Sequence, residues 1–475
     1  MNTLIERNVG FDMLDQKKID KIHEKSMYIM ENIGMKFYGD RALKLLKDAG
    51  CKIEDGNLVK FTANHVDKAL KHVPKKLDLY NRDGVKTMTI DQENQCFFGT
   101  HSDQLELVDP ISGKVRPFLK SDIKTMCKVA SALKNIYFVL SVGMTADVDA
   151  KVQTQSTFIE TIRNFDKTIN FSSNDIESLS DCINIAAEYV GGLKNLQDKP
   201  FIFNYCEPIP PLMHPIESTE KIIISAENRI PFVYLPYCMM GGTAPITPAA
   251  TLAQCNAEIL GGLVLAQLAA EGSPFIYSAM PSIIDMGTTI GSYGSPDFHR
   301  NIAAMADMAS SYGLPFFGTA GCSDAKTFDH QAASEVSYEV LSTMLSKANL
   351  IHDVGVMDHC NSVSPEAVVF VDEIIEGYKN YTRGISVNEE DFALDVIKEV
   401  GHGGHYLEVD HTLDNFRSVW YPDIFSRKMQ NPEESEIIPI IKKRINDILE
   451  GHNVPTPSKD QLDILANWDK KLGIQ

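Results

Sequence analysis

Residues 237–281 read YCMMGGTAPITPAATLAQCNAEILGGLVLAQLAAEGSPFIYSAMP, and this stretch decides the fold. It opens, after an apolar run at 230–236, with a turn that holds two adjacent glycines. Thr247 and Pro248 then suit the N-cap and the first position of a helix, because the hydroxyl accepts a backbone hydrogen bond and proline needs no donor there. The helical pattern ends at Gly272, and a second apolar run follows. Strand, turn, helix and strand in this order form the repeating unit of a parallel α/β protein.

The turn at Gly241 and Gly242 has two interpretations. It is either a tight connection in which glycine permits a positive φ, or a turn against which a ligand lies, since parallel α/β folds bind ligands beyond the C-terminal ends of their strands. No Gly-Lys-Ser/Thr follows the turn and the GxGxxG spacing is absent, so it gives little support for a phosphate site.

The same alternation of apolar runs and helical patterns continues along most of the chain. From about residue 136 onward the apolar runs are 137–143, 167–172, 200–206, 230–237, 273–280, 314–321 and 348–355. Several are apolar throughout, as expected for strands covered by helices on one side and by barrel core on the other. Together with one strand that these runs do not locate, they predict an α/β fold of the (β/α)₈ TIM-barrel class. An open doubly wound sheet is the alternative, because the runs do not encode the order of the strands.

The two ends of the chain depart from this pattern. Residues 1–90 contain amphipathic segments and are predicted to form an N-terminal helical extension. Residues 91–385 are assigned to the barrel, and within them 95–100 and 105–118 are predicted to pair as a hairpin around Pro-Ile-Ser-Gly. Residues 386–475 carry a Gly-His-Gly-Gly turn, aromatic-rich chain and two closing helices, which we interpret as a C-terminal cap or interface segment.

Composition and charge narrow the function classes. The 475 residues are 44% hydrophobic and 23% charged, as in a soluble globular protein, and the formal net charge is −19. This charge argues against nucleic acid as a partner, because binding phosphate needs a basic surface. Nine dispersed cysteines without CxxC pairs indicate reduced thiols. With neither a signal-peptide core nor a long uninterrupted apolar run, a cytoplasmic protein without a membrane span is expected.

Residues at or just past the strand ends are the candidates for a site, because the C-terminal ends of barrel strands face it. They combine aromatic and small side chains with few charges, which predicts a largely apolar pocket. The candidate set is Phe171, Asn204, Tyr205, Glu207, Tyr237, Phe317 and His352. Glu207 and Asp324 also form a candidate acid and base pair, although surface loops carry such pairs routinely.

Metal binding is not predicted. His352 with Asp353, and Asp358 with His359, form a His/Asp cluster, but their spacing lacks the helical HExxH pattern. We therefore interpret these histidines as structural or hydrogen-bonding groups rather than as ligands. Neither a GxSxG motif nor a Cys-His pair of defined spacing supports nucleophilic catalysis.

Five stretches carry a resemblance to a known family. They are GGTAPITPAATLAQCNAEILGGLVLAQL at 241–268, DMGTTIGSYGSPD at 285–297, GCSDAKTFDHQAASE at 321–335, ANLIHDVG at 348–355 and EVGHGGHYLEVDHTLDNFR at 399–417. In this order, and over nearly the whole chain, they resemble the trimethylamine methyltransferase family. The resemblance implies a (β/α)₈ barrel that passes a methyl group from a methylated amine to the Co(I) corrinoid of a separate carrier protein.

One departure from the family narrows the substrate. The trimethylamine enzymes carry a pyrrolysine, whereas this chain has only ordinary residues, and we place the replaced position in the loop 318–324. The chain therefore resembles the non-pyrrolysine branch, which implies a quaternary amine such as glycine betaine, proline betaine, carnitine or γ-butyrobetaine. A quaternary ammonium already contains a good leaving group, because losing a methyl leaves a neutral tertiary amine. The protein needs only to orient this cation and to exclude water.

The resemblance gives the candidate residues their expected roles. The aromatic rings of Tyr205, Tyr237 and Phe317 are expected to surround the ammonium group, which cannot donate hydrogen bonds, at about 0.5–2 kcal/mol per contact. His352, Asn204 or His101 would donate to a substrate carboxylate, and His352 is the expected catalytic residue. No arginine stands at a strand end to take that role.

The corrinoid is expected on a partner. The Asp-x-His-x-x-Gly pattern of cobalamin-binding modules is absent from the sequence, so a cognate corrinoid protein would supply the cofactor, and no tightly bound cofactor is expected here. Docking of that protein over the barrel would be transient, since it must leave with the methyl group. The alternative function is a non-catalytic barrel that binds betaines or a corrinoid partner. The sequence does not determine whether the protein forms a homo-oligomer.

Overall fold

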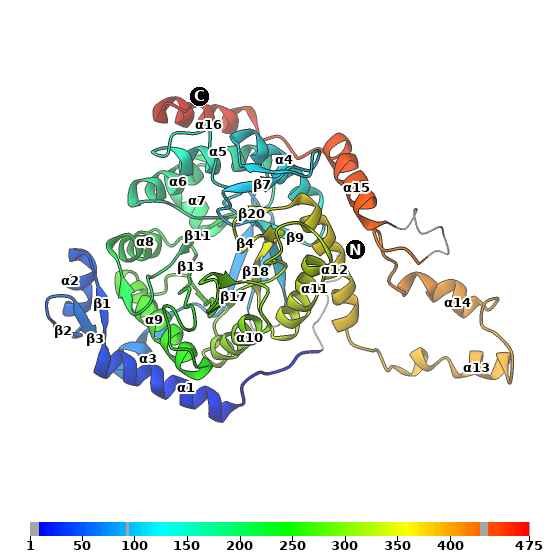
Figure 1. Ribbon diagram of the computed structural model, residues 1–475, viewed down its shortest axis with the longest axis horizontal. Coiled ribbons are helices and arrows are strands. Elements are labelled where there is room, and N and C mark those ends of the chain that lie inside the picture. The colour runs from blue at the N-terminus through cyan, green and yellow to red at the C-terminus, as the bar shows by residue number, and fades with distance from the viewer. Residues whose placement is uncertain (1–8, 92–94, 428–435, 475) are drawn as a thin grey trace.

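The centre of the computed structural model, which describes residues 9–91, 95–427 and 436–474, is a closed barrel of eight parallel strands (Figure 1). In chain order the strands are β6 (Phe97–Thr100), β9 (Ile136–Leu140), β10 (Thr168–Phe171), β11 (Ile202–Cys206), β13 (Phe232–Tyr234), β14 (Phe275–Ser278), β17 (Phe316–Thr319) and β18 (Leu350–Val354). Each pairs with the next, and β18 closes the ring against β6. The predicted (β/α)₈ barrel is confirmed, and the open doubly wound sheet is excluded.

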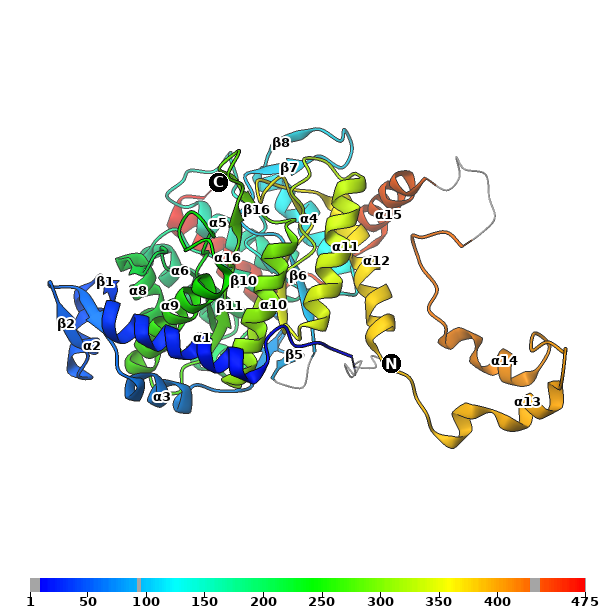
Figure 2. The same cartoon turned by 60° about the horizontal axis from the view of Figure 1, so that its bottom comes forward.

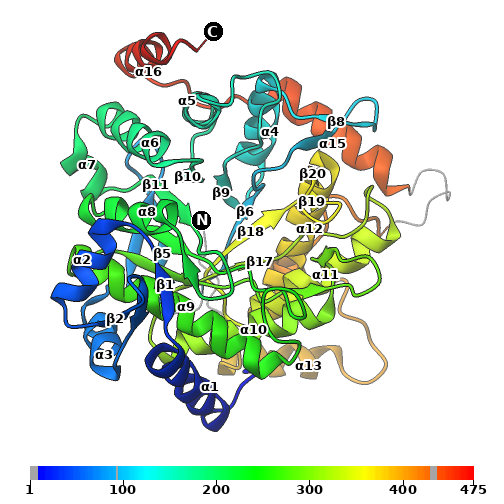
Figure 3. The ribbon, with the colours of Figure 1, turned by 60° about the vertical axis from the view of Figure 1, so that its left-hand side comes forward.

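Helices surround the barrel, as Figure 3 shows. They are α4 (Lys120–Ala132), α5 (Gln153–Asn164), α6 (Ile176–Tyr189), α7 (Leu193–Asp198), α8 (Ile216–Glu227), α9 (Pro248–Ala269), α10 (Pro296–Ser311), α11 (His330–Leu345) and α12 (Pro365–Thr382). The long helices begin beyond the C-terminal end of one strand and return toward the start of the next. The face at the C-terminal ends of the strands is called the mouth below.

The segment before the barrel contains helices α1 (Gln16–Tyr28), α2 (Asp40–Asp48) and α3 (Ala63–His72), with a π-helical turn at Ile29–Ile33. It also contains five short strands that the sequence did not reveal, β1 (Met35–Phe37), β2 (Lys52–Glu54), β3 (Leu58–Lys60), β4 (Leu77–Tyr80) and β5 (Lys86–Ile90). The first three form a small sheet with β12 (Met213–His214), which follows barrel strand β11. The N-terminal extension is thus mixed rather than wholly helical.

Helix α9 is the core helix that the opening sequence motif predicts. It starts with Thr247 at the N-cap position and Pro248 in the first turn, as expected, although the Thr247 side chain makes no capping hydrogen bond. Among the described residues it is the one helix long and apolar enough to cross a membrane, and 89% of its most apolar stretch is buried. The barrel strands cover one side of α9 while α1, α2 and α3 cover another, which explains why it is apolar all round.

The predicted hairpin of residues 95–100 and 105–118 is wrong in its first half. Residues 97–100 form β6, which pairs with β18 and β9 in the barrel, while the hairpin consists of β7 (Glu106–Val108) and β8 (Val115–Pro117). All four residues of β6 are buried, and a Cβ at Gly99 would lie 2.3 Å from the Phe138 ring. A strand covered on both sides belongs in the barrel rather than at the edge of a hairpin.

The C-terminal segment divides into two parts. Helices α15 (Ile437–Gly451) and α16 (Lys459–Leu472) pack on the outside of the barrel, α15 against α12 and α4 and α16 against α6 and α5. Residues 384–419 form what we call the arm, and it stands away from the barrel (Figures 1 and 2). The arm contains the short helices η2 (Glu389–Phe392), α13 (Leu394–Val400), α14 (Asp410–Asn415) and η3 (Phe416–Ser418).

Candidate active site

Strand β11 sends alternate side chains into the barrel and out of it. The ring of Phe203 packs against Phe317 of β17, across the barrel interior, with centroids 6.2 Å apart. Asn204 points the other way, and its amide donates to the Ser225 hydroxyl of α8 at 3.1 Å. Because the side-chain period of a strand is two, Tyr205 faces inward again, at the level of the mouth. The structure therefore does not bring Asn204 to the site.

A buried floor closes the mouth from below. Phe317 is fully buried, and the His352 ring lies 4.5 Å from it by ring centroids. The imidazole Nδ1 donates to the Gly318 carbonyl at 2.8 Å, and Nε2 lies 3.2 Å from the Asp353 carboxylate. Since a carbonyl oxygen only accepts hydrogen bonds, Nδ1 of His352 must carry a proton. Tyr205 lies above, 6.1 Å from His352 by ring centroids.

Two carboxylates lie at the mouth. Asp103 follows β6 and Glu207 follows β11, and strands β9 and β10 lie between these two in the ring. Both side chains reach solvent inside the mouth yet are surrounded by protein, and this burial raises the pKa of each carboxyl. The Ser172 hydroxyl donates to Asp103, and the Lys221 ammonium partly offsets the rise for both acids. Because protein surrounds these two carboxyl groups and no full counter-charge offsets them, the site favours binding of a cation.

Aromatic rings form one wall of the mouth. Tyr237 follows β13 and stacks on Tyr293, with ring centroids 6.2 Å apart and planes at 23°. Tyr293 comes from the loop after β14, just beyond the short hairpin of β15 (Ile283–Ile284) and β16 (Gly291–Ser292). Gly291 permits this approach, because a Cβ there would lie 2.7 Å from the Tyr237 hydroxyl. Tyr237 lies near both Tyr293 and Asp324, since each of these two groups shifts the pKa of Tyr237.

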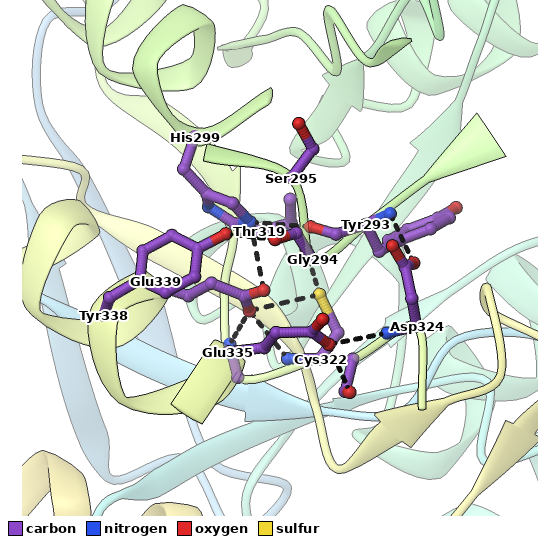
Figure 4. Close-up of polar contacts among 12 residues, drawn as sticks. Tyr293, Gly294, Ser295, His299, Thr319, Cys322, Asp324, Glu335, Tyr338 and Glu339 are labelled. Atoms are coloured by element: carbon purple, nitrogen blue, oxygen red, sulfur yellow. Dashed lines mark hydrogen bonds and ion pairs between the residues drawn. The ribbon is translucent and has the colours of Figure 1, made fainter. Parts of the chain in front are cut away.

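The loop that follows β17 is held by a carboxylate of α11 (Figure 4). One oxygen of Glu339 accepts the backbone N–H groups of Gly321 and Cys322, each at 3.0 Å. The other oxygen lies 3.2 Å from Nε2 of His299, which in turn donates to the Tyr293 carbonyl at 2.8 Å. Glu339 and His299 are both buried, so one carboxylate fixes the loop and ties it to the aromatic wall.

A second carboxylate of α11 holds the far end of the same loop. Glu335 accepts the Ser323 hydroxyl at 2.5 Å and the Asp324 N–H at 3.0 Å. Asp324 accepts the Tyr293 N–H at 2.7 Å, and Figure 4 shows this chain of contacts. Burial raises the pKa of the Cys322 thiol well above 9, so the thiol stays protonated and is a poor nucleophile.

Two further predicted residues lie beside the mouth. His101 is fully buried with φ at 70°, and neither ring nitrogen has a hydrogen-bond partner within the described part of the chain. Burial lowers the pKa of His101 to about 3, so the ring is neutral. Phe171 packs against Phe158 at 5.1 Å between ring centroids and lines a narrow cavity of about 20 Å³ that also touches Asp103.

The sequence located part of this site. Tyr205, Glu207 and Tyr237 come together at the mouth, and His352 and Phe317 lie beneath them. The sequence missed Asp103, because β6 was placed in a hairpin, and it missed Tyr293 and Glu339, which reach the site from a loop and a helix. The motif at 285–297 that contains Tyr293 was the available signal. Over the described residues, no three His, Cys, Asp or Glu side chains converge as metal ligands would.

Comparisons with known proteins agree with this architecture. The sequence profile of the family described as "Trimethylamine methyltransferase (MTTB)" matches residues 1–455. A glycine betaine methyltransferase of Desulfitobacterium hafniense is 30% identical over 420 residues, which cover 88% of this chain and 87% of that protein. A trimethylamine methyltransferase MttB of Methanosarcina thermophila is 28% identical over 466 residues, 96% of each chain. The monomethylamine methyltransferase MtmB of Methanosarcina barkeri has the same fold, with a TM-score of 0.51 and 14% identity over 98% of this chain and 96% of that one.

Proposed function

Because the chain belongs to the trimethylamine methyltransferase family, we propose that it transfers a methyl group from a quaternary amine of the betaine type to the Co(I) corrinoid of a separate corrinoid protein. The observation that supports this proposal best is the mouth, where tyrosine rings lie near two carboxyl groups whose pKa is raised. A quaternary ammonium has no hydrogen to donate, so it is held by aromatic faces and by negative charge.

For this methyl transfer the protein needs only to orient the quaternary amine. The carbon–nitrogen bond breaks with its electron pair remaining on nitrogen, and the methyl carbon bonds to cobalt. A neutral tertiary amine is released, so no general acid is required. Tyr205, Tyr237 and Tyr293 would contact the methyl groups, and Asp103 and Glu207 would supply the counter-charge. The walls of the barrel keep water from the cation while the corrinoid protein approaches the open mouth.

The orientation of a betaine follows from the same charges. A carboxylate placed near Asp103 and Glu207 would be repelled. At the floor, Nδ1 of His352 donates to Gly318, so a substrate carboxylate would bind Nε2 of a doubly protonated ring, in competition with Asp353. The Lys221 ammonium is not free to bind the substrate carboxylate, since it donates to the Ser173 carbonyl. We therefore place the ammonium group between the tyrosines and the two acids, with the carboxylate directed toward His352.

Methyl transfer to cobalt tests the proposed function. Purified protein is mixed with free Co(I) cobalamin and with glycine betaine, proline betaine, carnitine or γ-butyrobetaine, and methylcobalamin is followed by its absorbance. Turnover of at least one of these amines, and none without cobalamin, is expected. Binding of a betaine without any transfer, to free cobalamin or to a reduced corrinoid protein, would favour the alternative of a non-catalytic binding barrel.

Replacing His352 by asparagine is expected to raise the KM for betaines about tenfold, and to change the KM for choline much less. The reason is that a hydrogen bond to a charged group contributes about 1.5–3 kcal/mol, and choline has no carboxylate to accept it. Initial rates with both amines measure the difference. Equal losses for the two substrates would show that His352 acts only by supporting the barrel floor.

Acidic pH is expected to lower kcat/KM for a quaternary amine. The amine does not titrate, but the pKa of Glu207 is raised above 4.5 and that of Asp103 above 3.8, so both acids take up protons at a higher pH than ordinary carboxyls. Protonation removes the negative charge, so the rate should fall as pH decreases through these raised values, and Glu207→Gln should lower the plateau and flatten the decline. Methylation of Co(I) cobalamin by methyl iodide at each pH serves as the control. A rate that stays constant or rises toward acid would contradict this role.

A further inference from the structure

The arm is the largest feature that the methyl-transfer site leaves unused. No residue from 383 to 419 is buried, although this stretch is folded into two α-helices and two 3₁₀ turns. Its exposed large apolar side chains are Ile385, Val387, Phe392, Leu394, Ile397, Tyr406, Leu407, Leu413, Phe416 and Val419. Helices of seven and six residues are too short to be stable alone in water, and the arm has no core of its own. Contacts from outside the chain must therefore stabilise it.

The root of the arm shows which face of the barrel it leaves. Arg383 donates to the Ser418 carbonyl at 3.3 Å, so the arm departs and returns at one place, the end of α12. There the Lys379 ammonium donates to the Asn135 side chain at 2.7 Å, directly before β9 begins at Ile136. The arm thus starts at the face of the N-terminal strand ends, opposite the mouth.

This position separates the arm from the corrinoid protein. A carrier must approach the mouth and leave after each transfer, which calls for a modest interface. The arm instead exposes ten large apolar side chains beyond the far end of the barrel, and so many exposed apolar groups favour a permanent partner. A second copy of the same chain is always available as that partner.

We propose that the arm of one copy lies in a groove on a second copy of this chain. The groove runs between α1, α9 and α10, has a volume of about 630 Å³ and is lined mainly by apolar side chains, Leu14, Ile22, Leu252 and Ala304 among them. Lys17, Lys18, Lys21 and Arg300 also line it, together with one acid, Asp15; Lys18 pairs with Asp15 and Arg300 with Asp297.

The arm and the groove are complementary in both polarity and charge. On α13, Leu394 and Ile397 are 66% and 50% exposed, and their spacing of three places them on one face of the helix. Residues 384–419 carry eight acidic side chains against two basic ones, Lys398 and Arg417. An acidic helix with an apolar face therefore meets an apolar groove whose lining carries more basic than acidic side chains, which is the arrangement by which amphipathic helices dock.

The mass in solution, measured by light scattering after size-exclusion chromatography, tests this assembly. The full chain is expected to have at least twice its 52.8 kDa, and a chain in which a short Gly-Ser linker replaces residues 385–417 is expected to be monomeric. The linker is short because Arg383 and Ser418 already touch. A monomeric full chain, or an excised chain that keeps the higher mass, would overturn the proposal.

Point variants give a second test that does not depend on correct folding of the chain that lacks residues 385–417. Leu394→Asp with Ile397→Asp on the arm, and Ala249→Glu with Lys21→Glu at the groove, alter exposed residues and should each reduce the mass to that of a monomer. Ile111→Asp is the matched control, because Ile111 is 87% exposed on the β7–β8 turn and should leave the mass unchanged. If the arm variant or the groove variant keeps the oligomer, or if the control also dissociates it, the proposal fails.

Zero-length carbodiimide cross-linking identifies the groove directly. In an equal mixture of ¹⁴N and ¹⁵N chains that are dissociated and reassembled together, we expect isotopically mixed cross-links between Lys17 or Lys21 and Asp395 or Glu399. Mixed cross-links that place the arm on another surface, or arm cross-links only within one isotope, would refute the groove.

Discussion

Replacing Glu339 by alanine is expected to lower the free energy of unfolding by about 3–5 kcal/mol, the usual cost of removing one partner of a buried ion pair. The carboxylate accepts the N–H groups of Gly321 and Cys322 and lies 3.2 Å from the His299 ring. Its loss leaves two backbone donors without an acceptor, and His299 keeps only its bond to the Tyr293 carbonyl, in a site that water does not reach. Urea unfolding followed by circular dichroism measures the change.

Two further variants identify the cause of this loss. Glu339→Gln keeps an oxygen for the two backbone donors and is expected to lose less, about 1–3 kcal/mol, because only the contact with His299 changes its charge. Glu450→Ala, at an exposed site on α15, should change the stability by less than about 0.5 kcal/mol. A Glu339→Ala protein as stable as the wild type would show that the loop after β17 is held by other contacts.

The same substitution is expected to affect turnover more than substrate affinity. His299 donates to the Tyr293 carbonyl, so the loop after β17 and the aromatic wall are connected through Glu339. Loss of this positioning contact misplaces the cation relative to cobalt, and small errors in position reduce rates strongly. At a temperature where the variant remains folded, kcat should fall while the KM changes less. Equal changes in both would indicate general loosening instead.

Replacing two tyrosines of the mouth together, Tyr205→Leu and Tyr293→Leu, is expected to lower kcat/KM for a quaternary amine about 10- to 100-fold. Each aromatic contact with a desolvated cation contributes about 0.5–2 kcal/mol, and every 1.4 kcal/mol corresponds to a factor of ten. Leucine retains apolar volume but lacks the quadrupole of the ring. Single variants, including Tyr237→Leu, should show smaller losses of the same kind.

An isostere with an uncharged quaternary carbon separates the electrostatic contact from the loss of shape. 3,3-Dimethylbutanoate has the outline of glycine betaine with carbon in place of the charged nitrogen, so its inhibition constant should change little in the leucine variants. Tyr205→Phe is the matched substitution, because it keeps the ring, and it should retain most of the activity. If the carbon isostere and the betaine lose affinity to the same extent, the rings act as packing and not as a cation site.

The structure changes the composition of the predicted cation site. Tyr205 and Tyr237 are placed at the mouth, whereas Phe317 is fully buried beneath His352 and belongs to the barrel floor. Tyr293 stacks on Tyr237 and takes the third position in the proposal. A leucine at position 317 is therefore expected to cost stability through lost packing rather than affinity for the cation.

Local sequence located seven of the eight barrel strands and the main helices between them. The apolar runs and the helical segments between them are each specified by near neighbours, because strand and helix periodicity act over a few residues. The N-cap position of Thr247 and the helix after Pro248 were confirmed for this reason. Family membership was also carried by contiguous motifs, and the match over residues 1–455 confirmed it.

The tertiary structure decided what depends on pairing between distant segments. The run 97–100 has the same local character in a hairpin as in a barrel, and only its pairing with β18, about 250 residues away, makes it the eighth strand and brings Asp103 to the mouth. Whether Asn204 or Tyr205 faces inward depends on the phase of β11 relative to the barrel, and a shift of one residue would exchange them. Glu339 acquires its role only because α11 packs beside a loop 17 residues earlier. The arm, likewise, has apolar residues that are ordinary in sequence; they are exposed because no other part of the described chain folds over them.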